Sequence, residues 1–173
     1  MPQRRPVAPA AGLTLEVAHS VAEVPAAPWN RLISSAAYVD TYTLGALEAV
    51  FSADQGAPEH DWTFRYGLLR DRSGKLVGAA PYTVCLMKDD FIMDGSVSRA
   101  LEAARAEDPY AHTSRVVCLG TMFSEGCHWA LPDGPDRDAA VRTLVEWGES
   151  LMKEHDASCL LYTSPSPRDR YGS

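Results

Sequence analysis

Three residues close together in the second half of the chain, Glu125, Cys127 and His128, have side chains that could take part in catalysis. A carboxylate or an imidazole near a reacting amine accepts its proton, and a thiol beside an imidazole is a typical nucleophile. Neighbouring residues on a strand point to opposite faces, so Cys127 and His128 are not expected to meet. We therefore predict Glu125 or His128 as a proton acceptor. The alternative is a surface glutamate and a half-buried histidine near a sheet edge.

Tyr82 is a further candidate because it directly follows Pro81, which interrupts an otherwise regular apolar strand. Proline has no N–H to donate to a ladder of strand hydrogen bonds, so a bulge or a sheet edge is expected at this point. A bulge turns the next side chain in a new direction. Tyr82 is therefore predicted to contact substrate, and core packing is the alternative.

Three glycines, Gly120, Gly126 and Gly134, lie in the turn between an apolar strand and the strongest helical pattern of the chain. Glycine lets the backbone approach a ligand closely, and free N–H groups at a turn and at a helix N-terminus bind phosphate groups. A diphosphate site is one interpretation. Ordinary turn glycines are the other, because Arg137 is the nearest basic residue. No His, Cys, Asp and Glu residues have the spacing of metal ligands, so no metal site is predicted.

Hydrophobic periodicity places these residues in a chain of alternating strands and helices. The alternation of Trp62, Phe64, Tyr66 and Leu68, followed by turn residues at 70–75, predicts a β-hairpin. A sheet covered by helices in this order is typical of an α+β or α/β domain. The predicted elements are a strand at 13–17, helices at 24–33 and 35–51, hairpin strands at 62–69 and 76–87, a helix within 88–108 capped by Asp94 or Ser96, a strand at 114–119, and a helix from Pro135 to His155.

The helix predicted at 35–51 has apolar residues at helical spacing, and we expect them to form its buried face. These residues are Val39, Tyr42, Ala46, Leu47, Val50 and Phe51.

The composition limits the possible partners. The chain has 173 residues, 46% of them apolar, and a formal net charge of −7, which fits one soluble globular domain. No run of about 18 apolar residues is present, so no membrane span is predicted. The acidic balance argues against nucleic acid as a partner, because phosphate binding needs clustered Lys and Arg. Four cysteines without CxxC spacing predict a reduced, cytoplasmic protein, and residues 1–12 are predicted to form a disordered tail.

The end of the chain resembles the translation of a sequencing-library adapter. The eleven residues from Cys159 to Asp169 match, in frame, the product of a transposase-type adapter. We therefore predict that residues 159–173 are not native, that the domain covers residues 13–158, and that the natural polypeptide continues differently after Ser158. The alternative is a genuine tail rich in serine and proline.

Two segments resemble the acyl-CoA N-acyltransferase (GNAT) superfamily, in particular half-domains of the FemAB and peptidoglycan biosynthesis/recognition type. The segment 71–81, Asp-Arg-Ser-Gly-Lys-Leu-Val-Gly-Ala-Ala-Pro, is similar to the recurrent D-x-x-G-x-L-V-G-x-x-P hairpin of that group. The segment 117–126, Val-Cys-Leu-Gly-Thr-Met-Phe-Ser-Glu-Gly, precedes the long helix as in the family. The resemblance covers residues 13–158 and implies a mixed, largely antiparallel sheet that is flanked by helices and truncated at its C-terminal side.

The resemblance also implies transfer of an acyl group from acyl-CoA to a small-molecule or peptide amine. The proton acceptors and the tyrosine named above are then the catalytic candidates, and the three glycines are the candidates for binding the donor. The superfamily's Arg/Gln-x-x-Gly-x-Gly/Ala loop is absent from the sequence, and in two-half members the donor site belongs to the later half. Two other classes stay open: a non-catalytic half-domain that recognises substrate, and an unrelated Cys/His hydrolase.

Overall fold

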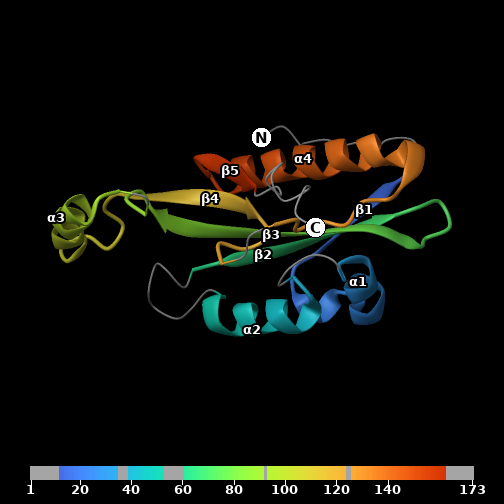
Figure 1. Ribbon diagram of the computed structural model, residues 1–173, viewed down its shortest axis with the longest axis horizontal. Coiled ribbons are helices and arrows are strands. Elements are labelled where there is room, and N and C mark those ends of the chain that lie inside the picture. Colours follow the sequence, from blue (N-terminus) through green and yellow to red (C-terminus); the bar gives the residue numbers. More distant parts are fainter. Residues whose placement is uncertain (1–11, 35–38, 53–60, 92, 124–125, 163–173) are drawn as a thin grey trace, which may run out of the picture.

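The computed structural model describes residues 12–34, 39–52, 61–91, 93–123 and 126–162, which form a five-stranded sheet with helices on both faces (Figure 1). The α+β class predicted from the sequence is confirmed. None of the described helices is both long and apolar enough to cross a lipid bilayer. Along the chain the elements are β1 (Thr14–Ala18), the 3-10 helix η1 (Val21–Glu23), α1 (Ala26–Leu32), α2 (Thr41–Phe51), β2 (Thr63–Arg70), β3 (Leu76–Lys88), α3 (Gly95–Arg105), β4 (Thr113–Leu119), the 3-10 helix η3 (Gly134–Asp136), α4 (Arg137–Glu154) and β5 (Cys159–Tyr162).

The strands stand in the order β1-β2-β3-β4-β5, and every neighbouring pair is antiparallel except β4 and β5, which run parallel. A parallel pair needs a crossover connection, and α4 supplies it. The predicted hairpin is present as β2 and β3, with Phe64 opposite Thr83 and Leu68 opposite Ala79. This mixed, largely antiparallel sheet is the one expected from the sequence and is consistent with a GNAT-like fold.

Side chains that alternate along the strands supply two separate cores. Figure 1 shows that α1 and α2 cover one face of the sheet and that α4 covers the other. Trp29, Tyr66 and Leu68 are fully buried in the core beneath α1 and α2. Leu144 and Trp147 of α4 pack into the second core, on the opposite face.

α4 packs close to the sheet through two reciprocal glycine contacts. A Cβ at Gly67 of β2 would lie 2.5 Å from the Trp147 ring, and a Cβ at Gly148 of α4 would lie 2.9 Å from the Tyr82 hydroxyl. The rings of Tyr82 and Trp147 meet edge to face, with 4.9 Å between their centroids. Because each glycine leaves room for an aromatic ring of the other element, the two contacts fix α4 over the sheet.

The buried face of α2 differs from the predicted one. This helix begins at Thr41, later than predicted, because the Asp40 carboxylate caps it by accepting hydrogen bonds from the first-turn N–H groups. Residues 39 and 40 are not helical, and the predicted start at residues 35–38 lies outside the described residues. Leu44 is fully buried, whereas Tyr42 and Val50 are 86% and 51% exposed. The prediction that Tyr42, Ala46 and Val50 face the core is therefore wrong, because all three are exposed. Apolar residues occur on all sides of α2, so periodicity alone does not identify its buried stripe.

Pro81 lies inside the central strand β3 and not at a bulge. Its carbonyl accepts a hydrogen bond from the Gly120 N–H at 2.9 Å, and in an antiparallel strand the N–H and C=O of one residue face the same neighbour. The missing N–H of Pro81 would therefore point toward β4 at the place where β4 has ended, at Leu119. The Gly120 carbonyl, which would accept from an N–H at position 81, accepts instead from the Thr83 hydroxyl at 3.0 Å, so the lost ladder hydrogen bond is replaced. The register shift of this hairpin lies between Leu69 and Arg70 instead.

β3 and β4 run beyond the other helices, and an arm that contains α3 connects their outer ends, at the far left of Figure 1. We define the arm as residues 88–91 and 93–112, and the other described residues as the body. Asp94 caps α3 by accepting a hydrogen bond from the Ser96 N–H, so of the two caps expected from the sequence, Asp94 and Ser96, the structure has Asp94. The arm exposes four large apolar side chains by 41% to 62%: Phe91, Met93, Val97 and Tyr110.

A buried ion pair holds the arm together. The side chains of Arg105 and Asp90 are each 5% exposed, and the guanidinium donates to the carboxylate. The same guanidinium donates to the backbone carbonyls of Ala111 and His112 at 3.0 and 2.9 Å. The hydrogen bond from Arg105 lowers the pKa of Asp90 to about 2. Both groups are therefore charged at neutral pH and tie α3 to the ends of β3 and β4.

β5 extends the sheet four residues beyond the domain boundary predicted at Ser158. It pairs in parallel with β4. Leu160 packs against the core under α4 and Leu161 against the opposite core, so both faces of this strand contact apolar groups. The N-terminal tail up to residue 11 and the rest of the adapter-like segment, residues 163–173, lie outside the described residues.

Candidate functional site

An apolar pocket of about 250 Å³ lies between α4 and the face of the sheet where β4 and β5 run parallel. Val141 and Val145 stand one turn apart on α4, so both reach the same pocket. The walls are hydrocarbon apart from one phenol and one indole, which suits an alkyl or thioester chain better than a charged group. The lining residues are Tyr82 of β3, Leu119 of β4, Trp129 of the following loop, Val141 and Val145 of α4, and Leu160 of β5.

Tyr82, predicted to contact substrate, forms a wall of this pocket. It is buried, and its hydroxyl donates to the Leu144 carbonyl of α4 at 3.0 Å. Burial raises the pKa of the Tyr82 phenol well above its ordinary value, and the nearby Cys118 thiol adds to this effect. The phenol is therefore a protonated hydrogen-bond donor at neutral pH. Its ring can contact a ligand, whereas its hydroxyl is already engaged with α4.

The loop after β4 folds back so that the imidazole of His128 covers Gly120. Gly120 has φ of +91°, and a Cβ added there would lie 2.4 Å from Cγ of His128. The Gly120 N–H donates to the Pro81 carbonyl at 2.9 Å, and the Gly120 carbonyl accepts from the Thr83 hydroxyl at 3.0 Å. Gly120 therefore leaves room for the imidazole. Its N–H group already donates to the Pro81 carbonyl, and donor binding by Gly120 stays a prediction.

His128 lies on the loop that contributes Trp129 to the pocket. Its side chain is 1% exposed, and burial lowers the pKa of the imidazole. It is therefore neutral at physiological pH, the state in which an imidazole accepts a proton. The neighbouring Cys127 thiol is directed to the Trp129 carbonyl at 3.4 Å. The role of His128 as a proton acceptor stays a prediction.

The other predicted site residues belong to the same loop between β4 and α4. Glu125 lies outside the described residues. Gly126 and Gly134 have φ of +105° and +78°, and no atom lies within 4 Å of where their Cβ atoms would stand. Gly134 begins η3, directly before α4. Both backbone conformations require glycine or a strained residue, and donor binding by these two glycines stays a prediction.

The N-terminus of α4 does not suit the diphosphate of acyl-CoA. A helix N-terminus attracts phosphate groups, but Asp133, Asp136 and Asp138 flank this one, with Arg137 among them. Carboxylates at that place interact favourably with the helix themselves and repel a second anion. The walls of the pocket therefore suit an alkyl chain, whereas the start of α4 offers little to a diphosphate.

The sequence does not predict the pocket as a unit. Periodicity places Val141 and Val145 on the apolar face of their helix. The space between them and the sheet depends on how α4 lies over β3 and β4, which periodicity does not report. Two valines one turn apart and a tryptophan opposite them indicate a cavity only when the position of the helix over the sheet is known. Within the described residues, no three His, Cys, Asp or Glu side chains come together as metal ligands.

Comparison with known proteins adds the fold alone. No family model matches the chain, and no curated protein matches it. A crystal structure of a single-residue mutant of the BH1408 protein from Bacillus halodurans is similar, with 11% sequence identity and a TM-score of 0.50. The alignment covers 91% of this chain and 85% of that chain. At this identity the likeness concerns the arrangement of the elements.

Proposed function

We propose that this domain takes part in N-acyl transfer from an acyl thioester of the acyl-CoA type to a small-molecule or peptide amine. The observation that carries the proposal is the apolar pocket of about 250 Å³ between α4 and the sheet, five of whose six lining residues precede Ser158. Each methylene group that leaves water for such a pocket contributes about 0.8 kcal/mol. The acyl arm of the donor is therefore the part that the pocket recognises.

The residues around the pocket have two roles in this proposal: positioning the acyl arm and accepting the amine proton. Val141 and the Tyr82 ring position the acyl arm and exclude water from it. Acyl transfer to an amine also needs a group that takes the amine proton, and the neutral imidazole of His128 is our candidate, with Glu125 as the second candidate on the same loop. His128 is covered in this arrangement, so its participation requires the loop to open. When bound, the thioester supplies an activated carbonyl.

We also propose a cytoplasmic location for the domain. All four cysteines are free thiols, which persist in a reducing compartment.

Isothermal titration of acetyl-CoA and of S-acetylpantetheine into the purified chain tests the proposal. We expect saturable binding of both ligands with affinities within about threefold of each other, because α4 offers little to the diphosphate. Val145→Phe fills the pocket and should weaken both ligands about tenfold or more. Met152→Phe is the matched control, since Met152 lies on the same helix and packs against the same core without lining the pocket.

Two outcomes contradict the proposal. If neither thioester binds saturably, the pocket holds no acyl arm. If Val145→Phe binds as tightly as the unchanged chain, the ligands bind elsewhere.

A second function, recognition of a cationic acceptor without catalysis, is favoured by a different pocket. This pocket has a volume of about 370 Å³ and is lined by Asp71, Asp133 and Asp136, with Lys75 beside them. Carboxylates form charge-assisted hydrogen bonds with a protonated amine. Saturable binding of hexylamine in the same titration, together with no thioester binding, would favour this function over acyl transfer.

A further inference from the structure

We infer that the pocket between α1 and the β2–β3 turn binds a small molecule that carries a carboxylate on an apolar body. The pocket has a volume of about 400 Å³, which is typical of small-molecule sites. It shares no lining residue with the pocket assigned to the acyl arm, and the inference does not rest on the proposed function.

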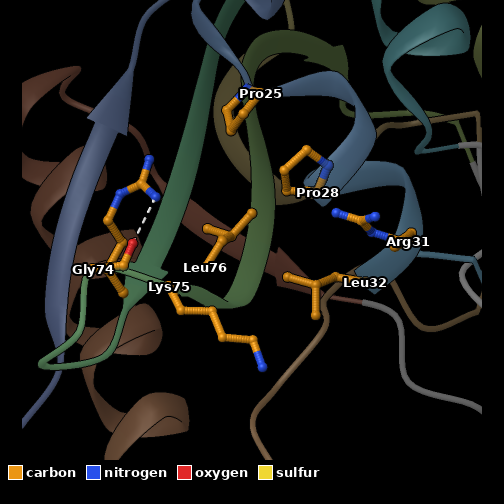
Figure 2. A pocket seen from close by; sticks show the side chains of 8 residues that line it. Pro25, Pro28, Arg31, Leu32, Gly74, Lys75 and Leu76 are labelled. Atoms are coloured by element: carbon orange, nitrogen blue, oxygen red, sulfur yellow. Dashed lines mark hydrogen bonds between the residues drawn. The ribbon is translucent and has the colours of Figure 1, made fainter.

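Cations gather at this pocket although the chain as a whole has a net charge of −7. Arg31, Arg70 and Lys75 line it, and none of the described residues that line it is acidic. Arg70 is engaged, since it pairs with Glu16 at 2.6 Å and donates to the Gly74 carbonyl at 3.1 Å, the dashed line of Figure 2. Arg31 forms no ion pair with any residue that the structure describes. Its charge is therefore available to a ligand.

The β2–β3 turn fixes the backbone of Lys75 beside this pocket. The Asp71 carboxylate accepts hydrogen bonds from the backbone N–H groups of Ser73 and Lys75 at 2.8 and 3.1 Å. The Gly74 N–H donates to the Asp71 carbonyl at 2.9 Å, and Gly74 takes φ of +82°. The backbone that carries the ammonium group is therefore ordered before a ligand arrives, which reduces the entropy lost on binding.

The walls between the cations are apolar and stiff. Pro25 and Pro28 come from the start of α1, and Leu76 is buried at the start of β3. Figure 2 shows the Arg31 side chain directed from α1 toward Pro28, and the Lys75 side chain extending from the turn below Leu76. Proline rings lose little side-chain entropy when a ligand covers them. A hydrocarbon body fits against these walls.

The shape of the charged groups selects the kind of anion. A guanidinium is planar and binds a carboxylate through two parallel hydrogen bonds, and the Lys75 ammonium adds a second positive charge. A protonated amine would meet three cationic side chains and no carboxylate among the residues that line this pocket. An apolar molecule without an anionic group would not use the charge of Arg31.

Amide chemical shifts of the isotopically labelled full chain, followed by NMR during titration, test the inference. The probes are 2-naphthoate, 2-naphthalenemethanol and inorganic phosphate, which separate the contributions of the carboxylate and of the apolar body. We expect saturable shifts at Arg31, Lys75 and Leu76 with 2-naphthoate. The alcohol and phosphate should bind at least about tenfold more weakly, because the alcohol lacks the carboxylate and phosphate lacks the apolar body.

Charge-removing variants locate the binding. Arg31→Gln should weaken 2-naphthoate about tenfold, and Lys75→Gln should weaken it by a smaller factor. Arg99→Gln, on the exposed surface of α3 in the arm, is the matched control and should bind as the unchanged chain does. All three side chains are exposed, so the variants should keep the melting temperature of the unchanged chain.

The inference is overturned if 2-naphthoate gives no saturable shifts, if the alcohol binds as tightly as the carboxylate, or if Arg31→Gln and Arg99→Gln have equal effects. Failure of this test is separate from failure of the thioester titration, because the two pockets use different residues.

Discussion

The body of the domain buries large apolar side chains on both faces of the sheet, whereas the arm exposes such side chains and is held by hydrogen bonds and ion pairs. In the body, Tyr66 and Leu68 have no exposed surface. In the arm, Phe91 is 62% exposed, and the buried residues are the charged pair Arg105 and Asp90. A region that depends on a few polar contacts opens locally at a lower free energy than a region that depends on apolar burial. The arm and the body should therefore respond differently to the same kind of change.

The largest effect should come from the apolar core of the body. Leu68→Ala removes a fully buried side chain beneath α1 and α2, and such truncations lower the free energy of unfolding by about 2–5 kcal/mol. Urea denaturation measures the change in the free energy of unfolding. Val50→Ala, on the exposed side of α2, should change it by about 0.5 kcal/mol or less. Equal losses for the two variants would contradict the assignment of the core.

A smaller and local effect should follow from the ion pair of the arm. Arg105→Met keeps much of the apolar stem but leaves the buried Asp90 carboxylate without its cation. We expect the amides of α3 to lose protection from hydrogen exchange while the amides of β2 and β3 in the body keep theirs. Arg99→Met, on the same helix and exposed, is the control. Loss of protection throughout the sheet would show that the arm and the body unfold together.

Acid should affect the two regions in sequence. Burial lowers the pKa of His128 below the usual 6.5, so the unfolded chain takes up a proton that the folded body does not, and the body loses stability as the pH falls below about 6.5. The pKa of Asp90 in the folded arm is about 2, so the stabilisation from its ion pair is complete above about pH 4 and is lost as the pH falls through about 2.

Urea denaturation and the NMR spectrum of α3, both recorded from pH 7 to pH 2, check this order. The free energy of unfolding should decline before the α3 resonances change. Changes at α3 near pH 5, with no decline in the stability of the body, would reverse the expected order.

The smallest effect is expected at the surface of the arm. Lys88 and Glu102 form an ion pair at 2.8 Å, but both side chains are about half exposed to water. Solvent screens such pairs, so Lys88→Ala should leave the melting temperature and the exchange protection of α3 unchanged. A clear loss of protection would mean that the exposed pair, and not only Arg105, holds α3 in place.

The sequence predicts local structure better than it predicts packing. The hairpin β2–β3 and a cap of α3 at Asp94 or Ser96 follow from patterns of a few neighbouring residues, and the structure has the hairpin and the cap at Asp94. The buried side of α2 and the position of Pro81 depend on what lies beside them. Tyr42 is exposed because the sheet accepts Leu44, and Pro81 is tolerated in a central strand because the Thr83 hydroxyl replaces its missing N–H.

The candidate site shows the same limit. Tyr82 and His128 can be chosen as candidates from their residue types alone. The contact of His128 with Gly120, however, depends on a loop that folds back. The pocket is lined by residues of strands and of a helix that are far apart in the sequence. The N–H of Gly120 is used by Pro81, a long-range contact that spacing does not show. Charge was more informative, since the acidic residues before α4 can be read directly and explain why that helix end does not suit a diphosphate.

The reciprocal contacts of Gly67 with Trp147 and of Gly148 with Tyr82 have a consequence for selectivity. Because each aromatic ring sits where the opposite backbone has no side chain, α4 cannot slide along the sheet in either direction without a collision. The spacing between α4 and the sheet beside Tyr82 is then held by these two contacts, and we expect it to change little when a ligand binds. For the acyl chains that we propose as ligands, we expect the affinity to depend more on the length of the chain than on the groups attached to it.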